Sequence, residues 1–387
     1  MINGWLQPQY GRPFTNNVGG QVIAVSGSNF INTTSSFGGP VGIFTNNGAV
    51  TVNAGATLGI TNGLVTTNAG TFTTAAGGAL DFSMAALNVP LGTVYTYTGA
   101  LTNNGTMSFS SGTNTVSGGL ANNGVLSVGG GTLNLNGTYT GNAGSGVNLS
   151  GGALTLASGV ILSTPTLTMT GGTLNGAGNV LVTNNFSQGA GLLGKFFGSV
   201  SITQSTGNLV IGAVGAIGAI NLAAPLGTLT VNGAITAASI SGLSATGVNL
   251  AATGTLTASG AGNAIVLDAG KGNFTNGAGA AALTVTSGRW LIYSTDPALN
   301  TLGGLLSGNP DLLGKAYINY APANVIEAGN RYLFALTPPL TVNLVPTVIN
   351  EIVGISNQRY KIPEDVLAVN TLTTGDGGNT QELPMCN

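Results

Sequence analysis

Side chains that could carry out acid–base or metal chemistry are scarce in this chain. It has no histidine and one cysteine, and Asp, Glu, Lys and Arg together make up 5% of its residues. Of these four types, only Arg12, Asp81 and Lys195 occur before residue 260. General acid–base catalysis and metal binding need several such groups close together. We therefore expect a protein that is not an enzyme and that has no cofactor or metal.

Three local patterns resemble chemical motifs but lack a required part. Residues 189–195 fit a Gly-rich phosphate loop, except that Phe196 stands where Ser or Thr would bind magnesium. Glycoside hydrolysis needs two carboxylates on one face, whereas Asp81 stands alone and the pair at 364–365 lies far along the chain. Residues 376–379 lack the repeated frame of a calcium-binding turn. A β-helical polysaccharide-active enzyme is therefore a remote alternative.

The last third of the chain combines charges with aromatic residues. One interpretation, which we favour, is a cap that closes the end of a repetitive fold with large side chains and an ion pair. The other is a contact surface for another subunit, because Arg, Trp and Tyr are frequent at interface hot spots. Cys386 is interpreted as a free thiol, with an intermolecular disulfide as the alternative. The candidate residues are Arg289, Trp290, Tyr293, Asp296, Arg331, Tyr332, Phe334 and Cys386.

Composition narrows the class of fold. The chain has 65 glycines, 43% hydrophobic residues and only 6% aromatic residues. This apolar content argues against a disordered linker, and the absence of a three-residue glycine period excludes collagen. With a net charge of −2, no basic surface for nucleic acid is expected. Gly and polar residues interrupt every apolar run, so we expect no membrane span. Residues 1–10 lack a signal-peptide pattern, so we expect any secretion signal to be removed or to lie on a larger precursor.

The sequence is internally repetitive. Residues 101–109 match residues 120–128, and the pattern at 130–135 returns at 151–156 and again at 171–175. A period of about twenty residues is typical of solenoids. Thr-Asn-Asn also recurs, at 15–17, 45–47, 102–104 and 183–185.

Within each repeat, apolar residues alternate with Thr, Ser or Asn, as in Leu229-Thr230-Val231. This alternation predicts short strands with one buried side, and the Asn-Gly and Gly-Gly pairs between them predict tight corners. Three strands and three corners make one coil of a right-handed parallel β-helix with about twenty residues per coil. Recurring Asn residues should form amide ladders along the stack. Sixteen or seventeen coils would give a rod roughly 80 Å long.

Changes in charge and glycine content divide the chain. We expect an N-terminal extension at 1–14, a β-helical rod at 15–304, a less regular cap segment at 305–345 and an extended tail at 346–387 that contacts another subunit. Within the cap segment, Asn309 and Pro310 predict the start of a helical turn.

The last part of the rod resembles a known family. The residues concerned are 262–276 (Gly-Asn-Ala-Ile-Val-Leu-Asp-Ala-Gly-Lys-Gly-Asn-Phe-Thr-Asn), 287–297 (Ser-Gly-Arg-Trp-Leu-Ile-Tyr-Ser-Thr-Asp-Pro) and 330–334 (Asn-Arg-Tyr-Leu-Phe). They resemble the C-terminal part of filamentous-haemagglutinin-like exoproteins, which are secreted β-helical proteins of Gram-negative bacteria. The resemblance implies an extracellular location and export through an outer-membrane transporter by two-partner secretion. The Asn-Pro-Asn-Leu motifs of that family's secretion domain are missing, since Asn-Pro occurs only at 309–310.

Two functions of different classes fit these observations. In the first, the chain is the protomer of an extracellular fibre that grows by head-to-tail association with further copies of itself, and the open strand edges continue the ladder between chains. In the second, it is the stalk of an adhesin that binds glycans, cells or abiotic surfaces. The first is favoured, because the repeats contain neither an exposed aromatic row nor an inserted loop.

Overall fold

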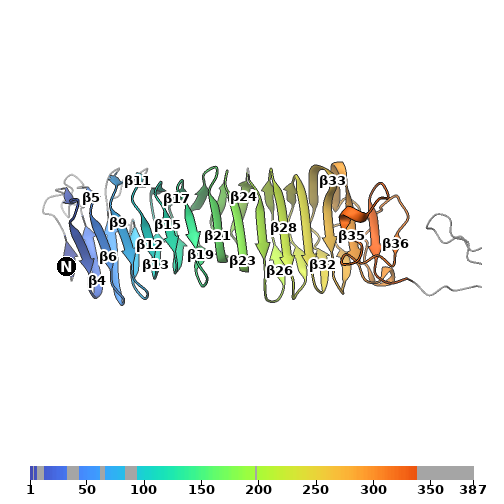
Figure 1. Ribbon diagram of the computed structural model, residues 1–387, viewed down its shortest axis with the longest axis horizontal. Coiled ribbons are helices and arrows are strands. Elements are labelled where there is room, and N and C mark those ends of the chain that lie inside the picture. Colours follow the sequence, from blue (N-terminus) through green and yellow to red (C-terminus); the bar gives the residue numbers. More distant parts are fainter. Residues whose placement is uncertain are drawn as a thin grey trace, which may run out of the picture.

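The computed structural model shows an all-β rod in which parallel strands run across the long axis (Figure 1). The structure describes residues 1–2, 4–6, 13–32, 43–61, 66–82, 94–196 and 198–337. These residues form a β-solenoid of about 13 coils, with about 21 residues from one coil to the next. The predicted fold class, an all-β parallel β-helix, is confirmed.

Each complete coil contributes one strand to each of three parallel faces, and long strands such as β33 pass round a corner from one face to the next. Face 1 comprises β2 (Phe14–Asn16), β5 (Phe44–Asn46), β8 (Thr66–Asn68), β11 (Val94–Tyr97), β14 (Thr113–Val116), β17 (Thr132–Leu135), β20 (Ala153–Leu156), β22 (Thr173–Gly176), β24 (Leu192–Phe196), β27 (Val214–Ala216), β30 (Ile235–Ala237) and the first parts of β33 (Leu256–Asp268) and β35 (Leu283–Ser294). Face 2 comprises β3 (Gln21–Ala24), β6 (Ala49–Val52), β9 (Thr71–Thr74), β12 (Leu101–Asn103), β15 (Leu120–Asn122), β18 (Tyr139–Gly141), the first parts of β21 (Ile161–Met169) and β23 (Asn179–Gln188), β25 (Val200–Thr203), β28 (Ala219–Ala224), β31 (Ser239–Ser244), the last parts of β33 and β35, β37 (Arg331–Phe334) and β36 (Leu312–Leu313). Face 3 comprises β1 (Trp5–Leu6), β4 (Gly27–Asn32), β7 (Ala56–Thr61), β10 (Ala79–Phe82), β13 (Thr106–Phe109), β16 (Val125–Val128), β19 (Gly146–Leu149), the last parts of β21 and β23, β26 (Leu209–Ile211), β29 (Leu229–Val231), β32 (Gly247–Leu250) and β34 (Asn273–Asn276).

The register of the strands reproduces the sequence repeats. Leu101 pairs with Leu120 and Thr106 with Val125, as the match between residues 101–109 and 120–128 predicts. The pattern at 130–135, 151–156 and 171–175 also falls on adjacent strands of face 1, where β17 pairs with β20 and β20 pairs with β22. Residues equivalent in sequence are therefore neighbours along the rod.

The apolar residues of each strand point into one continuous core. On face 2 the column Val50, Phe72, Leu101, Leu120 and Tyr139 is buried throughout. Strands such as β13 and β17 alternate buried with half-buried positions. This is the period-two pattern that the sequence predicts.

Buried asparagines close the ends of several strands. Asn103 donates from Nδ2 to Oδ1 of Asn122 in the next coil, at 2.8 Å, and accepts from the Gly105 amide at 3.1 Å. Asn16 and Asn46 form the same contact at 2.8 Å on face 1. The predicted amide ladder is therefore present, but in separate segments. At the fourth Thr-Asn-Asn motif the Asn184 and Asn185 side chains are exposed.

Glycine columns run along the corners between the faces. A Cβ built on Gly137 would overlap the carbonyl oxygen of Gly118, and Gly118 stands in the same relation to Gly99, Gly99 to Gly70, and Gly70 to Gly48. The backbone of each coil thus occupies the space where the next coil would place a side chain. Only glycine permits this approach.

Several sequence-based expectations require correction. The described residues form about 13 coils rather than sixteen or seventeen, because some coils are longer: Ala79 pairs with Thr106 and Leu291 with Arg331. At the strand spacing of about 4.8 Å the stack is roughly 60 Å long.

The domain boundaries also shift. Within the predicted N-terminal extension, Trp5–Leu6 already pairs with β4 in the stack. At the other end, the predicted cap segment contains β37, which pairs with β35. The predicted helical turn at Asn309 is absent: β36 follows it, and the only helical segments in the described residues are the 3-10 helices η2 (Pro297–Leu299) and η3 (Pro322–Asn324). The tail at 346–387 lies outside the described residues.

We predict that Gly137→Ala lowers the free energy of unfolding by about 1–3 kcal/mol, because the new methyl group forces two coils apart. Gly129→Ala is the matched control, since its Cβ would meet only the Ser150 hydroxyl at 3.9 Å. The control should be neutral or stabilising by up to about 1 kcal/mol. Urea denaturation of both variants measures the difference. Equal stability of the two variants would contradict the role of the glycine column.

Candidate functional site

The predicted aromatic residues meet at the C-terminal end of the rod. Trp290 and Tyr332 lie on the inner side of face 2, with ring centroids 5.0 Å apart in an edge-on arrangement, and Phe334 stacks on Tyr332 at 6.2 Å. The Tyr332 hydroxyl donates to the Leu305 carbonyl at 2.8 Å. These rings close the end of the core.

A second apolar layer covers the outer side of face 2 at the same end. Residues 314–328, here called the strap, cross outside the strands. Leu312 of β36 and Val325 of the strap pack with Leu291, Tyr293 and Leu333. The Tyr293 ring meets Tyr317 of the strap edge-on at 5.3 Å. Face 2 is therefore buried on both sides here, whereas outer positions of its other strands, such as Thr51, Thr102 and Ser201, are half-buried.

Two arginines fasten this cap by binding backbone carbonyls. Arg289 donates to Asn263 Oδ1 and to the Val325 carbonyl, both at 2.6 Å, and also to the Glu327 carbonyl. Arg331 donates to the carbonyls of Pro310 at 2.8 Å and Ala328 at 3.1 Å. We predicted an ion pair here, but the hydrogen bonds of both guanidinium groups in the described region go to carbonyl or amide oxygens. Neutral acceptors hold the strap to the sheet.

The remaining predicted residues lie apart from this cluster. Asp296 caps η2, accepting from the Ala298 amide at 2.8 Å. Cys386 lies outside the described residues. Trp290, Tyr293, Tyr332 and Phe334 are each 1–2% exposed. Their side chains pack within this chain.

Residues of the strap were missed because nothing in residues 314–328 repeats. The strands that the strap covers, β35 and β37, carry a signal of its presence. Residues 290–293 and 332–334 are consecutive apolar residues without alternation. Such runs indicate strands buried on both sides. The covering segment could therefore have been inferred, although not its path.

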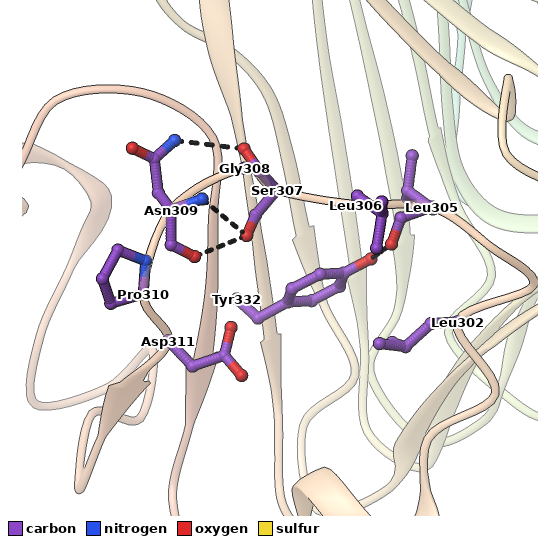
Figure 2. A pocket seen from close by; sticks show the side chains of 9 residues that line it. All are labelled: Leu302, Leu305, Leu306, Ser307, Gly308, Asn309, Pro310, Asp311 and Tyr332. Atoms are coloured by element: carbon purple, nitrogen blue, oxygen red, sulfur yellow. Dashed lines mark hydrogen bonds between the residues drawn. The ribbon is translucent and has the colours of Figure 1, made fainter. Parts of the chain in front are cut away.

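A cavity of about 500 Å³ opens beside the cap, between the loop 302–311 and Tyr332 (Figure 2). Its wall is largely apolar and includes Leu302, Leu305 and Leu306. Asp311 is the only ionisable carboxyl among its lining residues. Burial raises the pKa of Asp311, and the Arg331 charge opposes that rise.

The phosphate-loop pattern and metal-binding side chains form no site in the parts of the chain that are described. The Gly-rich pattern at 189–195 leads into β24, where Leu193 and Phe196 are buried in the core. Among the described residues no three His, Cys, Asp or Glu side chains are grouped to hold a metal. The same residues contain no helix of the length and apolar character needed to cross a membrane.

Comparison with known protein families, with curated proteins and with solved structures finds no match to this chain.

The two buried tyrosines of the cap provide a matched pair of variants. Tyr332→Phe removes a hydrogen bond and leaves the Leu305 carbonyl without that donor, so we expect a loss of about 1 kcal/mol in the free energy of unfolding. The Tyr293 hydroxyl is buried without a partner, so Tyr293→Phe should cost nothing or stabilise the fold. Denaturant titration measures both. An equal loss for both variants would contradict this assignment of the hydroxyls.

The pH dependence of stability should be opposite to that of a protein with paired carboxylates. Burial raises the pKa of Asp81 and of Asp268 above the ordinary 3.8, against the opposing effect of hydrogen bonds from Ser110 and Gly270 respectively. The folded state then holds these protons more tightly than the unfolded state. The free energy of unfolding should therefore rise as the pH falls from the raised pKa to about 3.8, and then level off.

Asp268→Asn should make this rise smaller, because asparagine keeps an acceptor for the Gly270 amide without the charge. Melting temperatures between pH 7 and pH 3.5 measure the effect in both proteins. A wild-type protein that loses stability steadily over this interval would overturn the prediction.

Proposed function

We propose that this chain is a non-enzymatic structural protein of the bacterial surface or extracellular matrix, whose β-helical rods associate end to end into a fibre. The observation that carries the proposal is the parallel pairing of successive coils, which stays in register apart from a few bulges. Each strand ladder, together with its Asn and Gly columns, joins one coil to the next without covalent or metal cross-links in the described residues. The same contacts can join coils of different chains.

The first described coil supports this proposal. The outermost described strands are β1 on face 3 and β2 on face 1, and on face 2 Ile2 bridges to Ala24 of β3. None of these segments contains a charged residue. Soluble β-proteins usually protect an edge strand with charges, proline or a covering segment. An uncharged edge favours pairing with another chain.

The proposed family, location and export route rest on the sequence resemblance. A β-solenoid is compatible with a filamentous-haemagglutinin-like exoprotein, and the proposal includes that family's extracellular location and its export through an outer-membrane transporter. The likeness of residues 287–297 supports this step.

A second candidate is the adhesin stalk, favoured by one surface. The column Thr96, Thr115, Asn134, Thr155 and Asn175 lies on the outer side of face 1 in five successive coils. Its members are half-buried and contact one another, as in the bond from Thr155 to Asn175 at 3.1 Å. A groove of about 620 Å³ lies at the corner beside Gly118 and Gly137. A flat, neutral array of hydroxyl and amide groups suits a glycan. Fibre formation and glycan binding are compatible.

Electron microscopy of the purified full-length chain tests the fibre proposal. We expect filaments longer than one rod, growing in number with protein concentration. The double variant Thr15→Lys with Ile23→Lys places two charges on the outer sides of β2, an edge strand, and of β3, which only Ile2 separates from the edge. It should give single rods, because lysine at a sheet edge opposes pairing.

The matched control is Thr115→Lys with Thr102→Lys, which places the same charges on faces 1 and 2 in the middle of the rod. This control should still form filaments. Single rods of the wild-type protein at high concentration would overturn the proposal, as would filaments that the mid-rod variant abolishes and the edge variant does not.

A further inference from the structure

One face of the rod contains a break in its strand ladder. On face 2, β18 pairs with β15 and the first part of β21 pairs with β23, but no ladder joins β18 to β21 in the described residues. The same coils are paired on the other faces, where β17 pairs with β20 and β19 with the last part of β21. The break lies in the middle of the rod, near β21 in Figure 1.

The groove of about 620 Å³ lies at this break. Its lining comes from the corners between faces 1 and 2 in three successive coils, at 117–119, 136–139 and 158–161. A Cβ on Gly118 or Gly137 would overlap a carbonyl of the preceding coil, so the stacking keeps these positions free of side chains. Three residues separate β14 from β15 and β17 from β18, whereas four separate β20 from β21. The longer third corner forms a turn, in which the Val160 amide donates to the Ala157 carbonyl at 3.1 Å.

Four polar side chains that line the groove have no partner in the described part of the chain. All four are exposed, and none of them forms a hydrogen bond with another described residue. They are Ser117, Asn136, Thr138 and Ser158. Nearby polar columns differ, since Asn103 donates to Asn122 and Thr155 to Asn175. The hydroxyl and amide groups of the groove therefore remain available to a ligand.

The surroundings of the groove define the chemistry of that ligand. No Asp, Glu, Lys or Arg occurs between residues 82 and 194, so these coils offer no counter-charge to an ion. Ile161 borders the groove and is 47% exposed, beside the buried Val160 and Tyr139. The ring of a neutral sugar has hydroxyl groups at its edge, which match the four polar side chains, and C–H groups on its faces, which match Ile161. Three corners at the strand spacing span about 10 Å, which calls for a chain of sugars.

We propose that this groove binds a neutral oligosaccharide. Its hydroxyl groups bond to Ser117, Asn136, Thr138 and Ser158, and the C–H face of one ring packs on Ile161. The glycan site rests on the adhesin candidate proposed above and is independent of fibre formation.

Isothermal titration calorimetry on the full-length chain tests the site. The neutral probes are the hexasaccharides of glucose, N-acetylglucosamine, xylose and mannose, and the acidic probes are oligosaccharides of alginate and heparin. We expect at least one neutral probe to bind, and the acidic probes to bind more weakly than that one. Binding of the acidic probes alone, or of none of the probes, overturns the proposal.

Variants of the lining locate the bound sugar. Asn136→Ala with Ser158→Ala removes two polar groups from the groove, so we expect about tenfold weaker binding of the neutral probe. The melting temperature should not change, because neither side chain bonds to a described residue. Gly119→Leu should abolish binding by filling the groove, since a Cβ there meets only the Thr138 hydroxyl, at 3.3 Å.

The matched control is Asn148→Ala with Ser187→Ala. These residues are of the same types, are exposed on face 3 and also lack a hydrogen bond to the described residues. The control should bind as the wild type does. Wild-type affinity in the groove variants would leave the adhesin candidate to another surface and overturn the groove as its site, and so would an equal loss in the control. Electron microscopy of the same variants reports on fibre formation separately, because none of the changes lies at an end of the rod.

Discussion

The distance between neighbouring coils is the constraint on which the rest of this structure depends. Parallel strands pair only if adjacent coils approach to about 4.8 Å at every corner as well as along the faces. At the corner that includes Gly99, Gly118 and Gly137, this brings a carbonyl oxygen into the space of a missing Cβ. The high glycine content therefore follows from the stacking itself. The scarcity of charge has the same origin, because inner positions are apolar and buried polar groups such as Asn103 must be satisfied by the next coil.

Repetition made the rod predictable from the sequence. Period-two alternation identified the strands, and matches about twenty residues apart fixed which strands are neighbours, as with Leu101 and Leu120. The number of coils was less accessible, because corners differ in length: forty residues separate Leu291 from its partner Arg331. A spacing rule derived from the regular coils cannot anticipate a detour that leaves the stack, covers its side and returns.

The residue types of the cap could be predicted from the sequence, but the positions of their side chains could not. Arg289, Trp290 and Tyr332 stood out because the rest of the chain is so uniform, but their types fit an interface as well as a cap. In the structure Trp290 and Tyr332 are buried in the core of the rod, and the strap buries Tyr293 on the outer side of face 2. The strap has no periodicity, so its position follows only from tertiary contacts such as those of Arg289 with the Val325 and Glu327 carbonyls. Periodic sequence patterns identify structural positions that recur from coil to coil, and they give no information on a segment that occurs once.

The in-register columns also restrict how such a chain can change in length. Among the regular coils, removing or duplicating one whole coil returns the glycines, asparagines and inward-facing residues to equivalent neighbours. An insertion of half a coil within the faces would instead bring side chains against corner carbonyls and leave amides such as that of Asn103 without an acceptor. Length variation among descendants of this chain should therefore occur in steps of one coil, with other insertions confined to the corners. The spacing of the backbone thus sets one coil as the smallest step by which the length of the rod can change.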